Sequence, residues 1–168
     1  MSDMTRAAEV AAKLALLREC LDAAGAAAIC LRGIDWFAWA TAGGSSAVLH
    51  TAELGVAEVL VTRDEAVILT DEIEAARLRE EEVPTGFTFH VTPWAQVELR
   101  ARYILGVAGD GLVLSDRPHG NEKPLPNALR GQQSRCERWR SSRRRCRTLH
   151  LSQRLRSLRH RRHRSRVR

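Results

Sequence analysis

The composition of the chain changes abruptly at residue 130, and this change limits which part can fold. Residues 130–168 contain sixteen arginines, no lysine and a single acidic residue, Glu137, which gives them a net charge of +15. Residues 1–129 contain 11 basic and 19 acidic residues, a net charge of −8. The basic segment has too few apolar side chains for a core. The sequence therefore predicts one acidic folded domain followed by a disordered tail.

Three interpretations of the tail are open. Its arginines could neutralise phosphates and Trp139 could stack on a base, so the tail could bind nucleic acid or another polyanion non-specifically. Cys136, Cys146, His160 and His163 could bind zinc, although their spacing matches no common zinc finger. Alternatively, the tail is the product of a shifted reading frame, because GC-rich codons for alanine and glycine encode arginine when read out of frame. The absence of lysine and alanine favours the shifted frame.

The pattern of apolar residues predicts that the acidic part begins with a helix followed by a strand. Residues 4–25 predict a helix because one apolar stripe recurs every three or four positions. The stripe consists of Val10, Leu14, Leu17 and Leu21. Residues 26–31, with the sequence AAAICL, form a continuous apolar run that is typical of a strand buried on both faces.

The remainder of the acidic part alternates between strand-like and helix-like patterns. Two β-branched runs around the turn RDE predict a hairpin, and a charged helix capped by Thr70 or Asp71 follows it. The expected elements are a hairpin of 56–62 with 66–70, a helix at 71–82, a strand at 86–92, a helix at 94–105 and a strand at 111–116. Interleaved helices and strands predict an α/β domain in layers.

No motif for nucleophilic catalysis, nucleotide binding or a zinc peptidase occurs in the sequence. His50, His90 and His119 stand at unrelated positions, and His90 is expected to be exposed on an alternating strand. Cys20 and Cys30 lie in apolar surroundings, as buried reduced thiols do, and this fits the cytoplasm. The chain shows no signal peptide and no apolar run of membrane-spanning length, so we expect no membrane contact.

The segment IDWFAWATAGGSSAVL, residues 34–49, carries two tryptophans before a pair of glycines. Trp36 and Trp39 could pack in the core while Gly43 and Gly44 turn the chain. Alternatively, this loop forms one wall of a substrate site or a contact between subunits, because amphipathic aromatic side chains serve both purposes.

Two segments of the acidic part resemble the N-terminal domain of the pita-bread metallopeptidases, the family of Xaa-Pro aminopeptidase, prolidase and creatinase. The first is the aromatic turn from Trp39 through Thr41 to Gly44, which follows the strand at 26–31. The second is the pattern IEAARLREEE after the predicted hairpin, in which the matching residues are Ile73, Glu74, Ala75, Ala76, Arg77, Leu78, Glu81 and Glu82. The resemblance covers residues 8 to 118 approximately.

The resemblance implies a mixed β-sheet flanked by helices and a role without catalysis. In that family the domain supports subunit association, so a homo-oligomer is possible, and it lends a wall to the active site. The candidate contact residues are Trp36, Trp39, Thr41, Gly43 and Gly44, and the family-motif helix carries Ile73, Glu74, Arg77, Leu78 and Glu81.

The catalytic domain of the family holds two divalent metal ions, manganese, cobalt or zinc, through two aspartates, a histidine and two glutamates. After residue 129 this chain has one glutamate and no aspartate, so we expect no cofactor and no peptidase activity. The expected organisation is an N-terminal-like domain at 1–118, a linker at 119–129 and the Arg-rich tail at 130–168.

Overall fold

The computed structural model describes residues 3–48, 53–127 and 129. Met1–Pro126 forms one compact unit, and the description below concerns this unit. The tail, with the arginines, Trp139 and the cysteine–histidine set considered above, lies outside the described residues.

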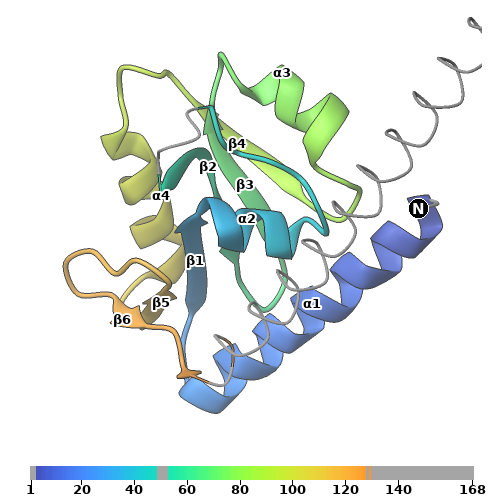
Figure 1. The fold of residues 1–168 in the computed structure, drawn as a ribbon. Helices are drawn as coiled ribbons and strands as arrows, with labels where there is room; N and C mark the ends of the chain where they lie inside the picture. The colour runs from blue at the N-terminus through green and yellow to red at the C-terminus, as the bar shows by residue number, and fades with distance from the viewer. Residues whose placement is uncertain (1–2, 49–52, 128, 130–168) are drawn as a thin grey trace, which may run out of the picture. The chain divides into compact units, whose positions relative to one another are not determined.

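A six-stranded mixed sheet forms the centre of the unit, in the strand order β4-β3-β2-β1-β5-β6 (Figure 1). The pairs β1–β2 and β2–β3 are antiparallel, whereas the pairs β3–β4, β1–β5 and β5–β6 are parallel. The strands are β1 (Ala28–Gly33), β2 (Leu54–Val61), β3 (Ala66–Asp71), β4 (Thr88–Thr92), β5 (Val113–Ser115) and β6 (Lys123–Pro124). The helices are α1 (Asp3–Ala24), α2 (Ile34–Ala40), α3 (Ala75–Arg77), the π-helical turn η1 (Leu78–Glu82) and α4 (Glu98–Ala108).

Helices cover both faces of the sheet, as Figure 1 shows for α1 and α4. Alternate residues of the central strands pack with Ile104 and Ala108 of α4 in one core cluster, which includes Ala28, Cys30, Leu60, Val67 and Leu69. The intervening residues of these strands point to the opposite face, where α1 contacts β1 and β2. The α1 stripe predicted from the sequence is buried throughout, and each such side chain contributes about 1.5–3 kcal/mol by leaving water.

The structure confirms the α/β class, the mixed sheet and the main elements predicted from the sequence. All six residues of β1 are buried, as the continuous apolar run predicted. β2 and β3 form the expected hairpin, with Val61 opposite Ala66 beside the turn. Asp71 caps the segment that follows, because its Oδ1 accepts the backbone N–H groups of Ile73 and Glu74, both at 3.1 Å.

Some local predictions were wrong. Residues 34–40 form the helix α2 and not a loop, because Trp36, Phe37, Trp39 and Ala40 can all be buried on one short helix. The charged segment 71–82 becomes helical only at Ala75 and widens into a π-helical turn from Leu78.

Two predictions of exposure or burial also failed. His90 is half-buried, because its ring stacks on Tyr103 of α4 with the ring centroids 3.8 Å apart. Cys20 is only partly buried, unlike Cys30, because it lies beside the apolar stripe of α1 and not within it. No helix in the described part of the chain combines the length and the hydrophobicity that crossing a membrane requires.

Candidate functional site

The two segments that carry the family resemblance meet in the structure, and α1 joins them. Arg6 donates from Nε to the carbonyl oxygen of Thr41 at 3.1 Å and from its guanidinium to the carbonyl oxygen of Glu82. The Ser45 backbone N–H donates to the Glu82 carboxylate at 2.7 Å, and the Gly44 N–H donates to Thr41 Oγ1 at 3.0 Å. We call these five residues the motif corner. It holds the loop after α2 against η1.

The tryptophans predicted as contact residues lie behind this loop. Trp36 and Trp39 are 5% and 4% exposed, and their rings meet edge to face with centroids 5.5 Å apart. Lys13 of α1 lies over the Trp39 ring, 5.3 Å from its centroid, and donates to the Trp39 carbonyl oxygen at 2.7 Å. Both rings therefore contribute packing, and Trp39 joins α2 to α1. Gly43 is the exposed member of the predicted set, with a φ of 123° that favours glycine.

The family-motif helix forms the other side of the motif corner. Its predicted residues are placed as follows: Ile73 and Glu81 are exposed, Glu74 and Arg77 are half-buried, and Leu78 is fully buried. Arg77 pairs with Glu74 at 2.8 Å and with Glu82 at 3.5 Å. The widening of the helix into a π-helical turn brings Glu82 within reach of Arg77.

A second polar cluster, which the sequence analysis missed, surrounds Arg32 near the end of β1. The guanidinium donates to both carboxylate oxygens of Glu122, at 2.6 and 2.8 Å, and to Glu58 Oε2 at 3.1 Å. It also donates to Ser115 Oγ at 2.9 Å and to the carbonyl oxygen of Arg117 at 3.1 Å. Only 8% of the Arg32 side chain is exposed, so its charge is compensated almost entirely by protein groups. We call these five residues the Arg32 network.

Asp116 fixes the backbone on which Arg32 stands. Its carboxylate accepts the backbone N–H groups of Arg32 at 2.7 Å and Gly33 at 2.8 Å. The pairing of β1 with β5 ends at Cys30 opposite Ser115, and the carboxylate of the next residue, Asp116, accepts these N–H groups at the end of β1.

Charge and burial oppose one another within the Arg32 network. Burial acts to raise the pKa of Glu122, but hydrogen bonds from Arg32 and from the His119 backbone N–H outweigh it, so the pKa lies below its usual 4.5. Burial acts to lower the pKa of Arg32. The hydrogen bond to Glu122 and the nearby negative charges outweigh burial, so the pKa of Arg32 is raised. Burial and the charge of Glu58 raise the pKa of the Cys30 thiol well above 9.0. Cys30 is therefore protonated and not nucleophilic.

The lowered pKa of Glu122 predicts a loss of stability in acid. A carboxyl whose pKa is lower in the folded state stabilises the fold above its unfolded pKa, and this contribution disappears as pH falls through the folded pKa. We expect the urea midpoint of the wild-type chain to fall as the pH is lowered below 4.5. The Glu122→Gln variant should be less stable at neutral pH and show a flatter profile. Identical profiles for the two proteins would contradict this assignment.

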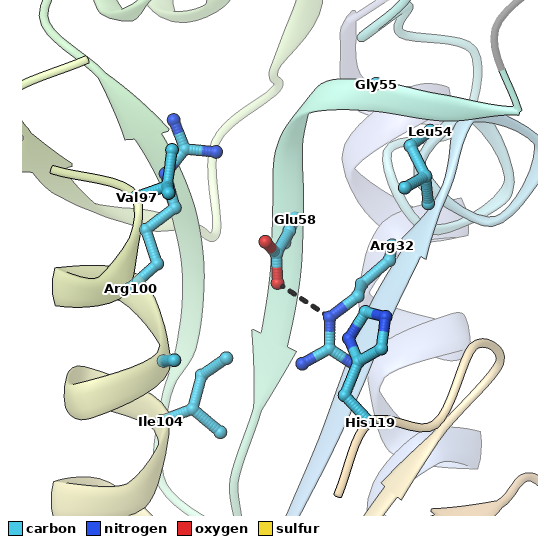
Figure 2. Close-up of a pocket in the computed structure, with 9 residues that line it drawn as sticks. Arg32, Leu54, Gly55, Glu58, Val97, Arg100, Ile104 and His119 are labelled. Atoms are coloured by element: carbon cyan, nitrogen blue, oxygen red, sulfur yellow. Dashed lines mark hydrogen bonds and ion pairs between the residues drawn. The ribbon is translucent and has the colours of Figure 1, made fainter. Parts of the chain in front are cut away.

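Two adjoining cavities open beside the Arg32 network, between the sheet and α4. The smaller, of about 230 Å³, is lined by Arg32, Leu54, Gly55, Glu58, Val97, Arg100, Ala101, Ile104 and His119 (Figure 2). The larger, of about 650 Å³, continues toward the C-terminal end of α4 and the β5–β6 loop. A cavity of the larger size with a few convergent polar groups is typical of a small-molecule site.

Large exposed apolar side chains gather at the end of the sheet where β2 begins and β1, β3 and β4 end. They are Val48, Leu54, Ile73, Trp94 and Val97, each at least half exposed. Leu54 and Val97 line the same cavity, and Ile73 and Trp94 follow the ends of the paired strands β3 and β4, beside which β2 begins. We call this set the apolar rim. Gathered apolar side chains of this size are typical of a contact with another protein surface.

The sequence held a weak signal for the Arg32 network. Arg32 ends a run of buried apolar residues, and Glu58 interrupts a β-branched strand, so each is a charge where an apolar side chain is expected. Glu122 gave no signal, because it lies in a segment rich in turn residues that was predicted to be a linker. That segment contains β6.

The described residues do not fit the metal centre that the resemblance implies for an intact peptidase. Among residues 3–48, 53–127 and 129, no three His, Cys, Asp or Glu side chains cluster where they could hold a metal ion. Glu58 and Glu122 do converge, but on the guanidinium of Arg32.

The fold and its two polar clusters define a mixed α/β domain with a buried charge network. No family model matches the chain, and no curated protein does. Among solved structures, it is similar to an Xaa-Pro dipeptidase from Bacillus anthracis, with a TM-score of 0.47 and 17% identity over 63% of this chain. It is also similar to an X-Pro aminopeptidase from Thermotoga maritima MSB8, with a TM-score of 0.45 and 12% identity over 73% of this chain.

The chain covers 26% of the length of the dipeptidase and 35% of the aminopeptidase.

Proposed function

We propose that this chain acts without catalysis, as an association domain of the kind that Xaa-Pro aminopeptidases and prolidases carry at their N-terminus. The observation that carries the proposal is the apolar rim beside the motif corner. The rim offers Trp94 and Val97 to solvent at 62% and 67% exposure, and burying them against another surface would be favourable. The loop from Thr41 to Ser45 beside it is held by Arg6 and Glu82.

The sequence supports the same proposal through the ordered resemblance of the two motif segments. In this proposal the fixed loop with exposed Gly43 supplies the wall that faces a substrate or a neighbouring subunit, while Trp36 and Trp39 support it from behind. The Arg-rich tail is then a frame-shifted remnant of the region that leads to the catalytic domain. The nucleotide sequence tests this part: an alternative frame after codon 129 should encode an alanine-rich stretch with the two aspartates, the histidine and the two glutamates.

Association is tested by the mass of the full chain in solution. We expect analytical ultracentrifugation in high salt, which screens the tail, to show a dimer or larger species that the Trp94→Asp variant converts to monomer. Leu105→Asp is the matched control, because Leu105 is equally exposed, at 64%, but lies on α4 away from the rim. A wild-type chain that is monomeric at every concentration, or a Trp94→Asp variant that stays associated, would refute the association role.

The absence of catalysis is tested separately. Purified chain incubated with an Xaa-Pro dipeptide and manganese or cobalt should release no amino acid above the rate of the metal alone. Hydrolysis that follows the protein through purification would overturn the non-catalytic assignment and leave the association result standing.

A further inference from the structure

The two cavities beside the Arg32 network adjoin one another along α4, and we call them together the groove. Both are lined by Arg32, Ala101, Ile104 and His119. The motif corner does not use this groove, whereas Leu54 and Val97 of the apolar rim line its smaller cavity. Its size alone would admit a small organic molecule.

The charges at the groove favour a cation. Arg32 is matched by Glu58 and Glu122, and Arg100 is matched by Asp71 at 3.0 Å, so these five side chains carry one more negative than positive charge. Both guanidinium groups are hydrogen-bonded to carboxylates, although the buried Arg100 Nε has no partner among the described residues. An anionic ligand that engaged the paired nitrogens would have to displace a carboxylate that is already hydrogen-bonded.

Glu58 provides the acceptor for such a cation. Its Oε2 accepts the hydrogen bonds from Arg32 and from the Cys30 thiol, whereas its Oε1 accepts none from the described residues. Figure 2 shows this second oxygen pointing away from Arg32 toward α4, where the smaller cavity lies. The side chain is 20% exposed, so the free oxygen is partly desolvated and its interaction with a cation is screened less than on an open surface.

Apolar side chains line the groove on either side of Glu58. Leu54 and Val97 lie at the mouth of the smaller cavity, and both are at least half exposed. Ile104 lies in its wall, and Leu105, 64% exposed, lines the larger cavity farther along α4. An aliphatic chain that follows α4 would cover these side chains.

We propose that this groove binds a small organic cation, with a primary ammonium group on Glu58 Oε1 and an aliphatic chain along α4. The ammonium group donates to the free carboxylate oxygen, and the chain buries the apolar lining. The ligand needs both parts for tight binding. A small inorganic cation would leave the apolar lining exposed, and a neutral aliphatic molecule would leave the Glu58 carboxylate oxygen without a partner.

Three probes with the same six-carbon chain test the proposal: hexylammonium, 1-hexanol and hexanoate. Each is titrated into the full ¹⁵N-labelled chain, and binding is read from the amide signals of β1, β2 and α4, so that contact of hexanoate with the arginine tail is not counted. We expect hexylammonium to bind about tenfold or more tightly than hexanol, as a charge-assisted hydrogen bond does, and hexanoate to bind most weakly. Equal affinity for all three, or tighter binding of hexanoate, would overturn the proposal.

Variants locate the site. Glu58→Gln should reduce the preference for hexylammonium over hexanol to about twofold or less, whereas Glu98→Gln, which removes an exposed charge of α4 outside the groove lining, should leave it unchanged. If Glu58→Gln does not fold, Val97→Trp decides, because Val97 is 67% exposed and its replacement narrows the cavity without touching the core. Hexylammonium binding that survives Val97→Trp unweakened would place the ligand elsewhere and refute this site.

Discussion

Replacing Arg32 with methionine is expected to lower the free energy of unfolding by about 3–5 kcal/mol, because it removes one partner of a buried ion network. Glu58 and Glu122 would keep their charges while losing the guanidinium that faces them, and Ser115 Oγ and the Arg117 carbonyl oxygen would lose their donor. Urea denaturation of the wild type and the variant measures the change directly. A domain of ordinary stability has about 5–15 kcal/mol in total, so the variant would be marginal.

The control for this prediction is Arg63→Met. Arg63 pairs with Asp22 at 2.9 Å, but both side chains are more than half exposed, so the loss should be about 0.5 kcal/mol or less. Adding Glu58→Gln and Glu122→Gln to Arg32→Met should recover part of the loss, since neutral amides cost less to bury than unpaired carboxylates. If Arg32→Met and Arg63→Met lose similar amounts, the network does not stabilise the fold as described.

The second large effect is expected at Gly44, in the motif corner. A Cβ at this position would lie 2.3 Å from the Glu82 carbonyl oxygen and 2.8 Å from Thr41 Oγ1. The first of these atoms belongs to the backbone of η1 and cannot rotate away, so Gly44→Ala must separate the loop from the helix. We expect a loss of about 2–3 kcal/mol in the free energy of unfolding, with faster amide exchange at Ser45.

Gly106 provides the matched control within the same chain. It lies inside α4, and a Cβ there would meet no atom within 4 Å. Gly106→Ala should therefore stabilise the protein by about 0.5–1 kcal/mol, because alanine loses less conformational freedom in a helix. Opposite signs for the two glycine-to-alanine changes are the expected result, and equal effects would mean that the motif corner is not tightly packed at Gly44.

Periodicity in the sequence was sufficient for most of the fold. The stripe of α1, the apolar run of β1 and the hairpin of β2 and β3 each repeat a pattern over several residues, so local sequence specifies them. The Asp71 cap was also predictable, because a short polar side chain before a helix has one common role there. The helix at Ile34–Ala40 was not, since its seven residues are too few for periodicity to show and burial of the two tryptophans decides its conformation.

The candidate site was predictable only in part. The motif segments could be named from the sequence, but their junction could not. Arg6 joins them by hydrogen bonds to Thr41, which is 35 positions away in the chain, and to Glu82, which is 76 positions away. The Arg32 network was not foreseen at all, because its members come from β1, β2, β5 and the loop between β5 and β6. Isolated charges in a sequence do not indicate their partners.

The sequence by itself determined where an acidic domain with a core can form, which segments become its main helices and strands, and which two segments resemble a known family. These properties depend on composition and on short-range periodicity, which act along the chain. The tertiary structure alone decided that Glu82 holds the motif corner, that the tryptophans are buried, and that a groove with a half-paired glutamate lies along α4. These properties depend on distances between residues that are far apart in the chain. Such distances are set only when the strands pair in their spatial order and the helices pack on the sheet.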